Sequence, residues 1–68
     1  MRLNYHNRRV LGSIVYAKDG IKLDDADQRH ALVLILKKMV EYTEKEDGML
    51  YRATAKGSKW WYDGITPR

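Results

Sequence analysis

The side chains with the clearest chemistry in this sequence are its lysines and arginines, which can bind phosphate. The chain has 13 Lys and Arg against 9 Asp and Glu, so its net charge is +4. This balance has two equally supported interpretations: an anionic partner such as nucleic acid, or a basic surface that contacts only solvent. The candidate nucleic-acid contacts are Arg29, Lys37, Lys38, Lys45, Arg52, Lys56 and Lys59. Binding through them should weaken as salt rises, because each phosphate contact releases counterions.

Three consecutive aromatic residues offer a second kind of chemistry. Trp60, Trp61 and Tyr62 could stack on unpaired bases or grip a protein partner, since both residue types combine a large contact area with a polar tip. Adjacent tryptophans cannot both face one core. We therefore expect Trp60 in the core and Trp61 at the surface, available to a partner.

Catalytic and metal-binding chemistry has little support. His6 and His30 are too few for a metal or triad site, and the chain has no cysteine. The carboxylates of Asp24, Asp25 and Asp27 fit no cation-binding motif, and helix capping explains them better. We predict a non-enzymatic protein with no catalytic residue, no metal and no cofactor.

The strongest helical segment is "DDADQRHALVLILKKMVEY", residues 24–42. Its acidic start suits the positive end of a helix, and its lysines lie near the negative end. Helical spacing predicts a core stripe of Leu32, Ile35, Leu36 and Met39.

The six apolar residues "ALVLIL" within this helix exceed one helical turn. Val33 or Leu34 is therefore expected to lie off the core stripe and to need a cover. A second copy of the chain could supply that cover about a twofold axis. We predict a homodimer with Val33 or Leu34 in its interface, and Trp61 as a further partner-binding residue.

The segment "RRVLGSIVYAKDG", residues 8–20, has two interpretations. In the first it is a helix with Asn7 as N-cap and Gly20 just past its end. In the second it is a strand, with "KDG" as the turn of a hairpin leading into "IKL".

The segment "VEYTEKEDGMLYRAT", residues 40–54, reads as a hairpin whose charged loop ends in a glycine. Acidic residues at the loop, Glu44, Glu46 and Asp47, count against close approach of DNA there. The next residues, "AKGSKWW", form either a second hairpin turn and strand, or a helix capped by Thr54.

This ending resembles the winged-helix family, in which the last wing strand commonly carries an aromatic residue, a threonine and a glycine before a closing helix. Tyr51, Thr54 and Gly57 fall on those positions. The resemblance covers roughly the last half of the chain and extends more weakly to residues 9–23, as the first helix and first short strand. Small phage-encoded winged-helix regulators look similar, so the resemblance implies a viral, DNA-binding transcription regulator. Residues 21–39 leave room for a shortened or fused helix-turn-helix, which lessens the expectation of base-specific reading.

Together these patterns predict one small α+β winged-helix-like domain over residues 1–68, with residues 1–6 and 65–68 flexible. The alternative is a ββαββ arrangement with one long helix on a small antiparallel sheet. The expected function is nucleic-acid binding, with duplex DNA as partner. The alternative is a protein-binding inhibitor or adaptor acting on a larger host machine. No apolar run reaches the roughly 18 residues of a membrane span, so we expect a cytoplasmic protein without a membrane partner.

Overall fold

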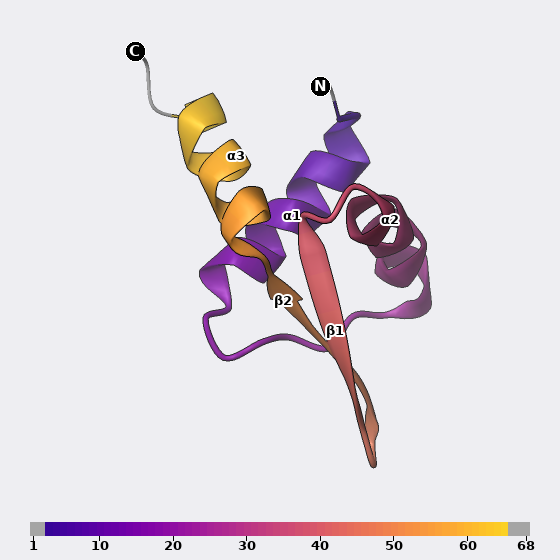
Figure 1. Ribbon diagram of the computed structural model, residues 1–68. Coiled ribbons are helices and arrows are strands. Elements are labelled where there is room, and N and C mark those ends of the chain that lie inside the picture. The colour runs from indigo at the N-terminus through magenta and orange to yellow at the C-terminus, as the bar shows by residue number, and fades with distance from the viewer. Residues whose placement is uncertain (1–2, 66–68) are drawn as a thin grey trace.

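Three helices and one β-hairpin make up residues 3–65, the part of the chain that this computed structural model describes (Figure 1). The elements are α1 (Tyr5–Tyr16), α2 (Asp25–Leu36), β1 (Val40–Lys45), β2 (Gly48–Ala53) and α3 (Ala55–Ile65). The predicted α+β class is confirmed, and the arrangement is compatible with a winged-helix-like fold. The ββαββ alternative is wrong, because the chain has a single hairpin, with two helices before it and one helix after it in sequence.

Helix α1 confirms the helical interpretation of the first segment but begins earlier than expected. The Asn4 side chain caps it by accepting a hydrogen bond from the Asn7 N–H at 2.8 Å. The prediction of Asn7 as N-cap is therefore wrong, and Asn7 is a buried residue inside the helix. The C-cap is Ala17 rather than Gly20, which lies in the following turn.

The N-terminal residues of the described part belong to the fold. Leu3 is buried in the core, and helix α1 starts at Tyr5. Residues 3–6 of the predicted flexible N-terminus therefore take part in the fold, and their flexibility stays a prediction. Residues 1–2 and 66–68 of the predicted flexible ends lie outside the described residues, and Ile65 is the last residue of α3.

Helix α2 confirms the predicted capping but only half of the predicted core stripe, because Met39 is buried and Ile35 packs against the core while the two leucines of the stripe are exposed. Asp24 accepts a hydrogen bond from the Asp27 N–H at 2.8 Å. Leu34 is fully buried, whereas Leu32 and Leu36 are 59% and 83% exposed. Because "ALVLIL" has no polar residue to mark its outer side, the sequence does not fix the rotation of the helix. Contact with α1 fixes it, and Leu34 faces the core.

The hairpin forms as predicted. β1 and β2 pair antiparallel, from Val40 opposite Ala53 to Lys45 opposite Gly48. Gly48 has φ +131°, a left-handed conformation that favours glycine at the turn. Ile21 pairs with Tyr51 on the other side of β2 through backbone hydrogen bonds of 2.9 and 2.8 Å. This bridge ties the α1–α2 connection to the hairpin, at the place expected for a short first strand.

The strand-to-helix junction at Thr54 confirms the helical alternative for the closing segment. The Thr54 hydroxyl accepts a hydrogen bond from the Gly57 N–H at 3.1 Å, so it caps α3. The same hydroxyl donates to the Lys38 carbonyl at 2.7 Å, and the Thr54 N–H donates to the Met39 carbonyl at 3.0 Å. The first turn of α3 is therefore fastened to the α2–β1 turn.

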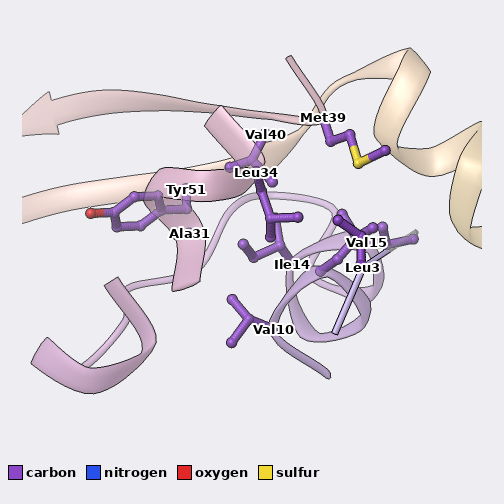
Figure 2. Close-up of a cluster of buried hydrophobic side chains, with 10 residues drawn as sticks. Leu3, Val10, Ile14, Val15, Ala31, Leu34, Met39, Val40 and Tyr51 are labelled. Atoms are coloured by element: carbon purple, nitrogen blue, oxygen red, sulfur yellow. The ribbon is translucent and has the colours of Figure 1, made fainter. Parts of the chain in front are cut away.

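The hydrophobic core is centred on α1, which lies between α2 and α3 (Figure 1). Figure 2 shows side chains from α1, α2 and the hairpin meeting there. The buried set is Leu3, Val10, Leu11, Ile14, Val15, Ala31, Leu34, Met39, Val40 and Tyr51. Among the described residues, no helix combines the length and apolar character needed to cross a membrane.

Candidate nucleic-acid interface

Most of the basic side chains lie outside the ion pairs of this fold. Within residues 3–65, Arg9 pairs with Asp27 at 2.9 Å, and Lys22 donates to the Asp47 carboxylate. The described cations outside these pairs are Arg8, Lys18, Arg29, Lys37, Lys38, Lys45, Arg52, Lys56 and Lys59. Their charges are available to an anionic ligand.

A shallow pocket of about 200 Å³ gathers two of these cations. Lys18 and Arg52 line it together with the hydroxyl-bearing Ser58, where the end of α1 meets β2 and α3. Ammonium, guanidinium and hydroxyl groups are all donors to phosphate oxygens. Arg52 was predicted as a phosphate contact, but Lys18 was not. The Ile21–Tyr51 bridge holds the segment after α1 beside β2, and a sequence pattern does not indicate that pairing.

Further predicted contacts lie around the first turn of α3. Lys56 and Lys59 are exposed on that helix, one on each side of the pocket residue Ser58 in sequence. The backbone carbonyl of Lys38 accepts a hydrogen bond from Thr54, the residue just before α3. Lys37 is adjacent to Lys38 in sequence. The N-terminus of a helix is itself positive. The structure therefore places Lys37, Lys38, Arg52, Lys56 and Lys59 near one end of α3.

Two predicted contacts lie elsewhere. Lys45 is at the hairpin tip, next to exposed acidic residues at positions 44, 46 and 47. The hydrogen bond from Lys22 lowers the pKa of Asp47 below its ordinary value, so this carboxylate remains charged. Arg29 is on the exposed side of α2, three residues from the exposed Leu32. The seven predicted cations therefore do not form one face.

Trp60 packs against the core as predicted, whereas Trp61, expected at the surface, is also partly buried against the core. The ring of Trp61, a residue of α3, packs against α1. There it meets the Tyr16 ring edge to face, at a centroid distance of 6.1 Å and an interplanar angle of 88°. Its indole N–H donates to the Tyr16 hydroxyl at 3.4 Å. Trp61 also lines a second pocket, between α1 and α3.

The predicted interface residues on α2 need a correction. Leu34 has no exposed surface, so it cannot contact a partner, and Figure 2 shows it among the core side chains. Val33 is partly buried. The exposed leucines of α2 are Leu32 and Leu36, two of the four residues assigned to the core from helical spacing.

The two histidines meet although they are 24 positions apart in sequence. The rings of His6 and His30 stack with centroids 5.3 Å apart, and the Nδ1 atom of His30 lies 3.0 Å from the Asn7 side-chain oxygen. This contact packs α1 against α2. In the described part of the chain, no group of three or more His, Cys, Asp or Glu residues could hold a metal ion.

No family model, curated protein or solved structure matches this chain. The winged-helix resemblance of residues 51–57 stays a prediction, as do the phage origin and the role in transcription that it implied.

Proposed function

We propose that this protein is a non-enzymatic, cytoplasmic nucleic-acid-binding regulator that holds its ligand mainly through backbone phosphates. The observation that carries the proposal is the group of unpaired cations at the first turn of α3. Lys18 and Arg52 share a pocket with Ser58, and Lys56 and Lys59 are exposed on the same helix as Ser58, within two residues of it in sequence. A phosphate bound there would release counterions, and the positive end of α3 would add to the attraction.

The side chains that α2 exposes favour contacts with phosphates over contacts with base edges. A complete helix-turn-helix inserts its second helix in the major groove and reads bases with polar side chains. In the described chain α2 is the one helix between α1 and the hairpin, and its exposed side includes Arg29, Leu32 and Leu36. Leucines supply no hydrogen bonds to base edges. We therefore infer a reduced winged-helix-like module with little sequence preference.

The test is the salt dependence of binding, measured by fluorescence anisotropy with labelled duplex and single-stranded oligonucleotides. The variant Lys18→Ala with Arg52→Ala removes two contacts, and we expect the slope of log K against log salt to fall by about 1.4 to 1.8. The matched control is Arg29→Ala with Lys45→Ala, which removes the same charge from the two sites that lie apart. Absence of binding at low ionic strength would refute the proposal.

A protein partner is the second candidate, and the exposed leucines of α2 favour it. Leu32 and Leu36 are 59% and 83% exposed on one side of the helix. Burying such a side chain is worth about 1.5 to 3 kcal/mol, which a second copy of the chain or another protein could recover. Sedimentation equilibrium of the wild type and of a Leu32→Lys, Leu36→Lys variant tests the homodimer. A monomer mass for the wild type at all micromolar concentrations would exclude it.

A further inference from the structure

The second pocket lies between α1 and α3 and has a volume of about 280 Å³. Tyr5, Arg8, Arg9 and Trp61 line it. Two aromatic rings and two guanidinium groups therefore surround one space, although Tyr5 and Trp61 are 56 positions apart in sequence. This chemistry differs from that of the first pocket, where no aromatic residue takes part.

Trp61 is held in place before any ligand arrives. Gly12 of α1 lies beneath it, and a Cβ atom at that position would come within 2.5 Å of the indole Cη2 atom. The absence of a side chain at Gly12 lets the ring lie on the helix, and the indole N–H donates to the Tyr16 hydroxyl one turn further along the same helix. A ring positioned in this way loses little conformational freedom when a ligand binds.

The remaining pocket residues are arranged by the helical repeat of α1. Tyr5, Arg8, Arg9, Gly12 and Tyr16 follow the spacing that puts residues on one side of a helix. Tyr5 is 74% exposed, with one ring contact to His6 at 5.5 Å. Arg9 is held by Asp27, whereas Arg8 is exposed and outside the described ion pairs. The pocket therefore has a fixed ring, an exposed ring and one uncompensated positive charge.

We propose that this groove binds an unpaired nucleobase, stacked on the Trp61 and Tyr5 rings, with the adjacent phosphate at Arg8. The inference rests on the proposed function and makes it narrower, because it names single-stranded or locally unpaired nucleic acid as the ligand. Bases inside a duplex have both faces covered by their neighbours and cannot stack on a protein ring. Aromatic stacking raises affinity by about five- to 150-fold per base and tolerates any base.

The positive charge of the groove selects this occupant over an uncharged apolar one. Arg8 provides a donor pair for phosphate, and arginine also stacks on base and aromatic faces. An acidic peptide with an aromatic side chain has related chemistry. It serves as the competing ligand in the test below.

The test compares three nucleic acids in the unmodified protein and its variants. They are a labelled oligothymidylate of about ten nucleotides, an abasic deoxyribose-phosphate oligomer of the same length, and a duplex. We expect the oligothymidylate to bind at least about tenfold more tightly than the abasic oligomer at the same salt concentration. In a Trp60→Phe variant, Trp61 is the sole tryptophan, and its fluorescence should be quenched by the oligothymidylate alone.

Exposed residues allow variants that leave the fold intact. Tyr5→Ala should weaken oligothymidylate binding about fivefold or more and leave abasic and duplex binding unchanged. The matched control is Tyr42→Ala, a tyrosine that is 51% exposed on β1. Arg8→Ala should weaken binding of the oligothymidylate and of the abasic oligomer alike and lower the salt slope, whereas Arg29→Ala should not.

Failure of this inference can be told apart from failure of the proposed function. If the abasic oligomer binds as tightly as the oligothymidylate, with strong salt dependence, base stacking is refuted and phosphate binding stands. If none of the three nucleic acids binds at low ionic strength, both are refuted. If an acidic aromatic peptide binds in a Tyr5-dependent way while the oligothymidylate does not, the groove is a protein-binding site and the inference is overturned.

Discussion

Substitution of Gly57 by alanine is the sharpest test of how α3 is attached to the rest of the fold. In an exposed helix interior, such a substitution stabilises a protein by about 1 kcal/mol, because alanine has the higher helix propensity. At Gly57 the structure predicts the opposite sign. A Cβ atom there would lie 2.0 Å from the Met39 carbonyl oxygen, and that oxygen belongs to the backbone.

The magnitude follows from what must move. To restore an ordinary contact of at least 3.4 Å, α3 and the Met39 backbone must separate by about 1.4 Å. That shift strains the two hydrogen bonds from Thr54 to the α2–β1 turn, each worth about 0.5 to 1.5 kcal/mol. Overpacking of a close contact costs about 1 to 3 kcal/mol. At the middle of these ranges the costs total about 4 kcal/mol, so after the gain of about 1 kcal/mol in helix propensity we expect Gly57→Ala to lower the free energy of unfolding by about 3 kcal/mol.

The assay is reversible urea and thermal unfolding, followed by far-ultraviolet circular dichroism. For a domain of this size the expected loss lowers Tm by roughly 10 to 20 °C. Ala55→Gly is the control, because this residue is exposed in the same turn and its change reports helix propensity alone, up to about 1 kcal/mol. A Gly57→Ala protein as stable as the wild type would show that α3 does not pack against the Met39 backbone.

Three further predictions concern the cap, the rotation of α2 and the hairpin tip. Thr54→Val removes the hydroxyl that caps α3 and should cost about 1 kcal/mol in urea unfolding, whereas Thr54→Ser should be close to the wild type. Leu34→Ala should lower the free energy of unfolding by about 2 to 5 kcal/mol, and Leu36→Ala by less than about 0.5 kcal/mol. A larger loss for Leu36→Ala would mean that Leu36 faces the core, as predicted from sequence. The pKa of Asp47 in the folded state is lowered mainly by the hydrogen bond from Lys22. The stabilising effect of this pair is therefore present above the pKa of Asp47 in the unfolded state, and it is lost as the pH falls through the pKa in the folded state. Carboxyl NMR titration should show this pKa rising in a Lys22→Ala variant, and an unchanged pKa would mean that the pair does not form in solution.

Local signals in the sequence were sufficient for most elements. Asp24 and Thr54 each cap a helix through a hydrogen bond that spans three residues, and Gly48 takes the left-handed conformation at the hairpin turn. Such interactions depend on neighbours in sequence, so residue type and spacing predict them. The basic composition likewise follows from the sequence alone, as does the expectation of phosphate binding.

Tertiary structure decided the rotation of α2 and the composition of both pockets. The run "ALVLIL" is apolar all around its helix, so packing on α1 chose Leu34 for the core and left Leu36 exposed. Lys18 joins Arg52 because a backbone bridge ties the α1–α2 connection to β2, and Trp61 reaches α1 because Gly12 leaves space for its ring. These contacts join residues from distant parts of the chain, and several helix rotations satisfy the local rules equally well. Close packing of the whole core selects one of them.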